Sequence, residues 1–457
     1  MNASTTVPPP RTVSRRLAPS NASAVAIEFF FWTSAGLVLF FMVILRLDDD
    51  RDGLTAASSV LSLALGLRIF LSHGRHTITV NGLFSLSLAM FVGFSGLYIP
   101  AFSYPAADSI YVFQAILGGY SMQVIVGFLA WGSQRRYSRA TVRRVYAPVS
   151  LMNKFAILGF IVFIGAIGVN TLASETTISE SMAFTAICAS TVGLLWRRNA
   201  RLFGLSSALI LTMLGLYAFV LHSGQGRLRI VALFCAVGTL YSVRFLRPWI
   251  KPLIVVGLPV AIAWLAASRL SLQESLATGA SVGRTGLESM VAPLAVFSQL
   301  LEAADHGLVT PVYGTSFLSI LSVVIPSSVW PDAPKPLGYE LVAITDPLKY
   351  DSGFSTVATS AGEAYYNFGW AGIPIVSVVV ALLIRWGDGT LARLTMSPSI
   401  SSAGFWILVT LVLTGAVADY AWSGVHTYVA RSALRLPLVA IFGAVTWMAV
   451  RKKPHWG

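Results

Sequence analysis

Residues 151–170 read LMNKFAILGFIVFIGAIGVN, twenty residues with one charged side chain, Lys154. A helix of about 20 apolar residues crosses the ~30 Å hydrocarbon core of a bilayer. Similar runs recur along the chain, which has 457 residues, 55% of them hydrophobic and 11% charged, and a mean hydropathy of +0.72. A soluble core of this composition would expose large apolar surfaces to water. The sequence therefore predicts an all-α, polytopic integral membrane protein and excludes a soluble enzyme, a disordered regulator and a disulfide-stapled secreted domain.

About twelve apolar ranges are predicted to be transmembrane helices. They are 26–46, 54–72, 83–102, 110–131, 151–170, 178–196, 203–221, 228–246, 250–267, 363–385, 402–420 and 429–450. The chain then divides into an N-terminal tail (1–25), helices one to nine (26–267), one long loop (268–362), helices ten to twelve (363–450) and a C-terminal tail (451–457).

The distribution of Lys and Arg predicts that both tails lie in the cytoplasm. In this orientation 22 basic and 2 acidic residues fall on the inner side, and 10 basic and 17 acidic residues fall on the outer side. Reversing the topology would invert this asymmetry. Membrane orientation thus explains the net charge of +13, and nucleic acid is not an expected partner.

The long loop, 268–362, is therefore predicted to be extracytoplasmic. Its apolar stretches 289–303 and 312–326 are too short to span the membrane, and we expect interfacial or re-entrant helices that cover a site at the membrane surface. The chain lacks a P-loop, a dinucleotide fingerprint, an HExxH motif and paired CxxC motifs, and its inner loops have few carboxylates. Any chemistry is expected on the outer side.

Arginines on the outer side are candidates for binding a lipid diphosphate, because a guanidinium group binds phosphate oxygens bidentately and stays charged. Arg431 and Arg435 are four residues apart and would share one face of a helix. Arg227 follows a glycine-containing turn that could bring backbone close to a ligand. The alternative is that these side chains snorkel to ordinary headgroups. The candidate set is Arg227, Arg229, Arg284, Arg431 and Arg435.

The segment 362–372, GEAYYNFGWAG, carries a second candidate group. Helical spacing would place Glu363, Tyr366, Asn367 and Trp370 on one face. Glu363 is the first candidate for the base that takes a proton from a sugar hydroxyl, and His306 is the second. The other three residues are candidate glycan contacts. Glu363 could equally cap a helix, and the aromatic residues could belong to a membrane-interface belt.

The proline-rich segment 325–336, IPSSVWPDAPKP, fixes a rigid path that displays Trp330, Asp332 and Lys335 as further candidate glycan contacts. The acidic run 48–52 could hold a divalent cation, but a solvated acidic turn is the favoured interpretation. No pair of histidines has metal-ligand spacing on an outer helix, so we expect neither a metal nor a cofactor.

These features together resemble the Wzy-type O-antigen polymerases, which join oligosaccharide repeat units. The resemblance rests on the topology, an outer arginine after a glycine-containing turn, the W-P-D-x-P-K-P segment and the motif G-E-x-Y-x-N-F-G-W-x-G. Similarity of residues is confined to about 222–238 and 283–372. The O-antigen ligases share the architecture, but the chain lacks a clear counterpart of their outer-loop histidine motif.

The resemblance implies a glycosyltransferase of GT-C-like architecture on the outer face of the bacterial cytoplasmic (inner) membrane. It implies transfer of the growing glycan from undecaprenyl diphosphate to a new lipid-linked unit, without nucleotide or metal. The expected partners are the undecaprenyl-diphosphate-linked oligosaccharide, the lipid bilayer and, from the family, a flippase and a chain-length regulator.

Three other functions stay open. A GT-C glycosyltransferase that uses a polyprenyl monophosphosugar would need the acidic run 48–50 and a metal ion. An O-antigen ligase would transfer the finished glycan to another acceptor. A lipid-linked glycan transporter would carry ionisable residues near the membrane midplane, where this sequence has few carboxylates.

Overall fold

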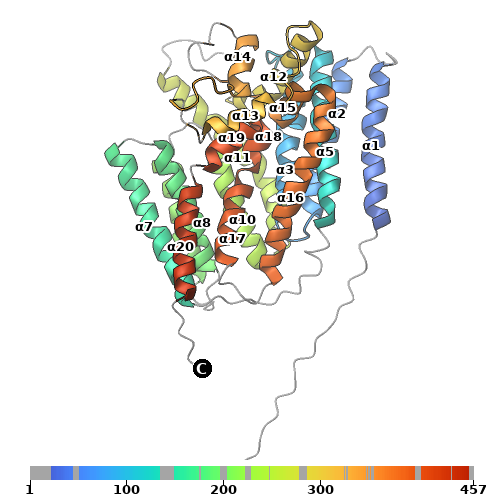
Figure 1. The fold of residues 1–457 in the computed structure, drawn as a ribbon. Helices are drawn as coiled ribbons and strands as arrows, with labels where there is room; N and C mark the ends of the chain where they lie inside the picture. Colours follow the sequence, from blue (N-terminus) through green and yellow to red (C-terminus); the bar gives the residue numbers. More distant parts are fainter. Residues whose placement is uncertain are drawn as a thin grey trace, which may run out of the picture.

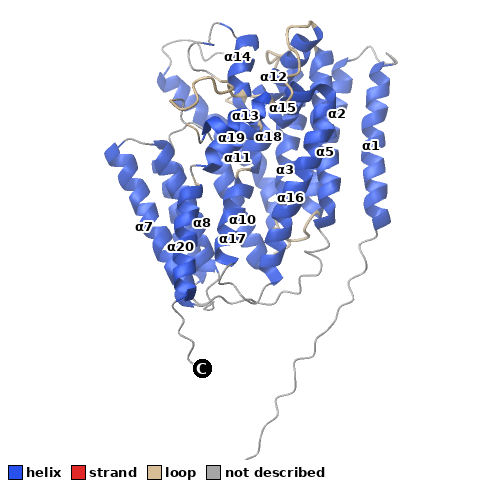
Figure 2. Cartoon of the chain, in the orientation of Figure 1, coloured by secondary structure: helices blue, strands red, loops and turns tan. Residues whose placement is uncertain are grey.

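The structure is a computed structural model that describes residues 22–44, 51–133, 149–173, 176–195, 203–221, 228–245, 247–276, 286–323, 325, 328–345, 347, 350, 355–396, 403–433 and 435–451. These residues form helices and connecting loops, and no strand is present among them (Figure 2). The predicted all-α fold class is therefore confirmed.

The first half of the chain forms a series of long helices. They are α1 (Ala22–Ile44), α2 (Arg51–Ser72), α3 (Val80–Leu88), the π-helix η1 (Ala89–Phe94), α4 (Ser95–Ala101), α5 (Ser109–Leu129), η2 (Ala130–Ser133), α7 (Val149–Ala173), α8 (Thr176–Leu195), α9 (Phe203–Leu216), the π-helix η4 (Tyr217–Leu221), α10 (Leu228–Phe245) and α11 (Ile250–Leu276).

The second half alternates short and long helices. They are α12 (Glu288–Asp305), α13 (Thr315–Leu318), η5 (Ser319–Val323), α14 (Leu337–Thr345), α15 (Thr359–Phe368), η7 (Gly369–Ala371), α16 (Gly372–Met396), α17 (Ala403–Gly415), α18 (Val417–Ser423), α19 (Val425–Ala433) and α20 (Leu436–Arg451). In Figure 1 the helices α12 and α14 lie at the upper end of the bundle, α7, α8 and α20 at the left, and α1 at the right edge.

Seven helical stretches of the described chain are long and apolar enough to cross a membrane: Asp52–Ser72, Val80–Ala101, Ser109–Leu129, Asn153–Leu172, Ile178–Leu195, Gly204–Leu221 and Thr359–Ala392. Shorter apolar helices cover Val25–Leu39, Leu228–Val243 and Leu408–Ser423. Each of the twelve ranges predicted from the sequence overlaps a described helix. This is the pattern of a polytopic membrane protein, whereas twelve crossings and a GT-C-like arrangement stay predictions.

Three of the predicted helices are interrupted, the eleventh only by a turn at Ala416 between α17 and α18. The tenth, expected to begin at 363, begins with α15, breaks at Gly369 and continues as α16 from Gly372. The backbone angle φ of Gly369 is +62°, a value that residues other than glycine rarely adopt. The last, expected over 429–450, consists of α19 and α20, which are joined by a turn at Arg435. Pro437 lies in the first turn of α20, where a missing backbone N–H costs little.

The long loop is largely helical where it is described. Helix α12 buries Leu294, Phe297 and Leu300 and packs against α4, α5 and η1, so it is part of the bundle rather than a helix on its surface. The second expected surface helix, over 312–326, consists of the two short helices α13 and η5. Helix α14, which was not predicted from the sequence, packs on α12.

Candidate functional site

A group of charged side chains is buried where α8, α10, α18 and α19 come together. Glu180 of α8 forms an ion pair with Arg229 of α10, and Asp419 of α18 forms one with Arg431 of α19. Both carboxylates are buried, and both helices that carry them pack against α10. Charged groups within apolar helices are costly and usually serve a function. These four residues and Arg435 are the arginine cluster below.

Arg435 is the residue of the arginine cluster whose buried charge is least compensated by hydrogen bonds and ion pairs. Its side chain is 2% exposed, and no described residue accepts a hydrogen bond from its Nε or Nη1. The guanidinium carbon lies 3.8 Å from the centre of the Phe184 ring, which gives a cation–π contact. Asp419 lies within electrostatic range, and its Oδ2 also has no hydrogen-bond partner among the described residues. Among the described residues, the cluster contains three guanidinium groups and two carboxylates.

A π-helical turn brings Tyr217 to the arginine cluster. Tyr217 begins η4 at the end of α9 and is fully buried. It lies within electrostatic range of Glu180, Arg435, Arg229 and Asp419. Single π-helical turns inside α-helices often occur at functional sites. The turn thus adds a phenol to a site that consists otherwise of charged groups.

Glu363 contacts α18 and α19, the two helices that carry Asp419 and Arg431. Its carboxylate is buried, and its Oε2 accepts a hydrogen bond of 2.7 Å from the backbone N–H of Val425, the first residue of α19. Tyr420 of α18 is within electrostatic range of Glu363 and stacks on Phe84. The short helices α18 and α19 therefore contact Glu363, the base predicted from the sequence, as well as the predicted arginines.

Two titratable groups of α19 stay neutral near pH 7. Burial lowers the pKa of His426 below its ordinary value, and burial raises the pKa of Tyr428 to about 12. The positive charge of this helix is thus carried by Arg431.

The residues after Glu363 divide into two groups. Tyr366 and Asn367 are buried on α15 like Glu363, and Asn367 Nδ2 donates hydrogen bonds to Ser316 Oγ (2.6 Å) and to the carbonyl oxygen of Glu363 (2.8 Å). Trp370 lies beyond the break at Gly369, is half exposed and contacts Tyr365 edge to face. The prediction that all four share one helix face is wrong for Trp370, because α15 ends before it.

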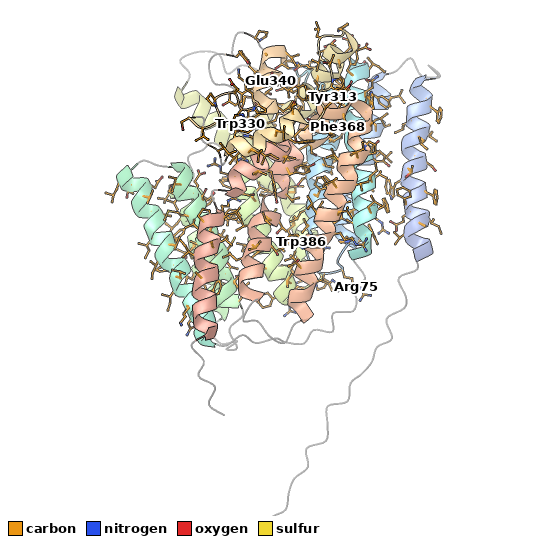
Figure 3. All side chains as sticks on the ribbon, viewed as in Figure 1. Arg75, Tyr313, Trp330, Glu340, Phe368 and Trp386 are labelled. Atoms are coloured by element: carbon orange, nitrogen blue, oxygen red, sulfur yellow. The ribbon has the colours of Figure 1, made fainter. Side chains whose placement is uncertain are left out.

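Trp330 of the proline-rich segment lies toward the upper end of the molecule (Figure 3). Trp330 is partly buried, and Asp332 and Lys335 are exposed. Lys335 Nζ donates a hydrogen bond of 2.6 Å to Tyr350 Oη. His306 is exposed just after α12. Their proposed glycan and proton-transfer roles are left as predictions.

The structure places Arg431, Arg435 and Arg229 in the arginine cluster. The prediction that Arg431 and Arg435 share one helix is wrong, because the turn at Arg435 separates α19 from α20. Arg227, Arg284 and the acidic run 48–50 lie outside the described residues.

Three residues of this site were not predicted from the sequence: Glu180, Asp419 and Tyr217. A usable signal existed for the two acids, since each is a lone carboxylate within an apolar run and such residues are functional candidates by default. No comparable signal marks Tyr217, because nothing in an apolar run indicates a π-helical turn.

Comparison with known proteins finds no matching family model, no similar curated protein and no similar solved structure. The resemblance to repeat-unit polymerases therefore rests on the motifs in the sequence.

Proposed function

We propose that this protein is a membrane glycosyltransferase that polymerises oligosaccharide repeat units carried on undecaprenyl diphosphate. The observation that carries the proposal is Arg435, a buried guanidinium group with two nitrogen atoms, Nε and Nη1, whose N–H groups no described residue accepts. A buried donor without a partner is costly, and a buried charge without compensation is more so. An anionic ligand would satisfy both requirements.

A diphosphate is the anion that suits the arginine cluster best. Arg431 and Arg435 can be contacted by neighbouring phosphate oxygens, and guanidinium groups match phosphate geometry. Arg431 is already held by Asp419, so its position is fixed before a ligand arrives. Apolar helices around the cluster, among them α8 and α10, suit the polyprenyl chain.

The reaction follows from this placement. A hydroxyl of the acceptor sugar attacks the anomeric carbon of the donor glycan, the bond from that carbon to the diphosphate oxygen breaks, and undecaprenyl diphosphate leaves. Fixed guanidinium groups stabilise the charge that develops on the leaving group. The hydroxyl proton passes to a base, for which the sequence offers Glu363 and His306. The reaction would take place on the outer face of the bacterial cytoplasmic membrane, after a flippase has delivered the substrate.

The test uses purified protein in phosphatidylcholine liposomes. A lipid-diphosphate-linked repeat unit, identified from the host glycan, is added with a chelator and without nucleotide sugar, and products are separated on a gel. We expect a ladder of lipid-linked oligomers. Arg435→Lys should reduce the rate by about tenfold or more, since Lys cannot donate in a fork, while the exposed Arg247→Gln serves as a matched control without effect.

Other outcomes would replace the proposal. Transfer of the glycan to a different acceptor, without a ladder, would indicate a ligase. Activity that returns with a divalent metal and a polyprenyl monophosphosugar would indicate the other class of glycosyltransferase. Movement of the lipid-linked glycan across the bilayer without a new glycosidic bond would indicate a transporter.

A further inference from the structure

We infer that Glu363 is a positioning residue that fixes the start of α19 and thereby holds Arg431 and Arg435 in place for the lipid diphosphate. The inference rests on the proposed function for the identity of the ligand. It assigns Glu363 a role that differs from the base suggested by its sequence motif.

The first step is the contact between Glu363 and α19. The carboxylate Oε2 accepts the N–H of Val425 at 2.7 Å, and this N–H belongs to the first turn of α19, where no helical carbonyl can accept it. Glu363 thus supplies a hydrogen-bond acceptor to the end of α19.

The second step is Gly424, the residue between α18 and α19. Its φ is +84°, and its N–H donates to the carbonyl oxygen of Tyr420 at 2.8 Å, which ends α18. A Cβ at this position would lie 2.1 Å from Glu363 Oε2. Backbone and carboxylate are therefore packed so closely that α19 cannot shift without moving Glu363.

The third step is the anchoring of Glu363 itself. Asn367 Nδ2 donates to the Glu363 carbonyl oxygen and to Ser316 Oγ, and the backbone N–H of Tyr313 donates to the carbonyl oxygen of Asn367 at 2.8 Å. Helix α15 is thus tied to the segment 313–316, which leads into η5, and η5 itself packs against α19. Helix α19 leads within one turn from Val425 to Tyr428 and, one turn later, to Arg431, so the position of Glu363 sets the position of the guanidinium groups.

Substitutions separate a positioning role from a role as base. Glu363→Gln keeps a carbonyl oxygen that can accept the Val425 N–H, but it cannot take a proton from a hydroxyl. Glu363→Ala removes the acceptor. Gly424→Ala forces carboxylate and backbone apart. Gly369→Ala is the matched control, because the backbone angles of Gly369 (φ +62°, ψ −154°) are close to those of Gly424 (φ +84°, ψ −160°). The atom nearest to a Cβ added at Gly369 is Pro311 Cγ, at 3.9 Å.

The experiment measures binding and turnover in phosphatidylcholine liposomes. Undecaprenyl diphosphate is titrated, and its Kd is obtained from protection against thermal unfolding. We expect Glu363→Ala and Gly424→Ala to raise this Kd and the donor KM by about tenfold or more, the scale of a buried N–H left without an acceptor. Glu363→Gln should stay within about fivefold of the unchanged protein, because its amide oxygen can still accept the Val425 N–H, with kcat affected less than KM.

Opposite results would overturn the inference. If Glu363→Gln abolishes kcat while the Kd is unchanged, Glu363 is a base; if Glu363→Ala binds undecaprenyl diphosphate like the unchanged protein, it does not position α19. Should Glu363→Ala or Gly424→Ala fail to fold, the split between KM and kcat in Glu363→Gln decides alone. The two proposals fail separately, since a missing ladder refutes the polymerase while the Kd series still reports on α19.

Discussion

Arg435 and Asp419 carry opposite buried charges, and their removal should affect stability in opposite directions. Arg435 lacks partners for two of its nitrogen atoms, Nε and Nη1, among the described residues, so Arg435→Met, which has a similar length, removes an unsatisfied charge. We expect its free energy of unfolding to be unchanged or raised by about 1–4 kcal/mol. Asp419→Asn leaves the guanidinium group of Arg431 without its carboxylate and should lower stability by about 3–5 kcal/mol.

Thermal unfolding in detergent checks this pair of substitutions. The Arg435→Met protein should be stabilised because a site that binds an anion is less stable when it is empty. It should also be inactive because it has lost the guanidinium group that binds the diphosphate. The idea is contradicted if Arg435→Met is strongly destabilised, since Arg435 would then have a structural partner. Undecaprenyl diphosphate should protect the unchanged protein and fail to protect the Met variant.

The buried side chain of His73, at the end of the helices opposite the arginine cluster, should make the stability of the protein depend on pH. It lies in the loop between α2 and α3, its Nδ1 is 2.8 Å from Thr79 Oγ1, and Lys251 Nζ donates to its carbonyl oxygen. Burial, followed by the charge of Lys251, lowers its pKa from 6.5 to about 3. Asp388, 3.9 Å away, does not outweigh the burial.

The unfolded state therefore binds a proton that the folded state rejects, in the window between pH 6.5 and about 3. Stability contributed by neutral His73 is present above pH 6.5 and falls by about 1.4 kcal/mol per pH unit below it. Melting curves between about pH 7.5 and 5 should show a smaller loss in His73→Gln than in the unchanged protein. An equal loss in both would show that other groups cause it.

The sequence revealed some residues of the site for a definite reason. Arg431, Arg435 and Glu363 are charged residues at the boundaries of long apolar runs, and position relative to a run can be read directly. The contacts between Glu363 and Val425, or between Arg431 and Asp419, join residues that are 62 and 12 positions apart, and no local pattern indicates them.

At the scale of the element, hydropathy located the helices but not their breaks. An apolar run reports where a helix lies because burial in lipid depends on composition summed over many residues. A break depends on a single backbone angle, such as φ at Gly369 or Gly424, and glycine adopts positive and negative φ with similar ease. The separation of α15 from α16 and of α18 from α19 was therefore not predictable.

The close approach of α2 to the π-helical stretch after α3 gives a prediction for a helix pair. A Cβ on Gly66 would lie 2.5 Å from Ala89 Cβ and 2.5 Å from the carbonyl oxygen of Ser85. Gly66→Ala should push the two helices apart and destabilise the protein by about 1–3 kcal/mol. Gly168→Ala on α7, where an added Cβ meets no atom within 4 Å, should be neutral or stabilising by up to about 1 kcal/mol.

Unfolding of the two variants under the same conditions provides the comparison. Equal stabilities would mean that α2 and the π-helical stretch can separate without loss of packing. The result matters for the candidate functional site, because α3 packs against α18. Phe84 of α3 stacks on Tyr420 of α18.

At the scale of the whole molecule, charged clusters lie at both ends of the helices. The arginine cluster lies at one end, and the group of His73, Lys251 and Asp388 lies at the other. In this second group Asp388 Oδ1 accepts a hydrogen bond from the N–H of Val80 at the start of α3. In Figure 3, Arg75 lies at the lower end, whereas Tyr313, Trp330 and Glu340 lie at the upper end. The arginine cluster belongs to helix ends that the charge distribution predicts to be near the outer side.

Accessibility of engineered cysteines tests this topology. Leu308 and His76 are both exposed, the first in the loop after α12 and the second beside Arg75. The native Cys188 and Cys235 lie within apolar helices, Cys188 fully buried, and give little background. In intact cells a membrane-impermeant maleimide should label Leu308→Cys and not His76→Cys, while both should be labelled after permeabilisation. Labelling of His76→Cys alone would reverse the topology and place α12 and α14 in the cytoplasm, where a lipid-linked glycan delivered to the outer leaflet could not reach them.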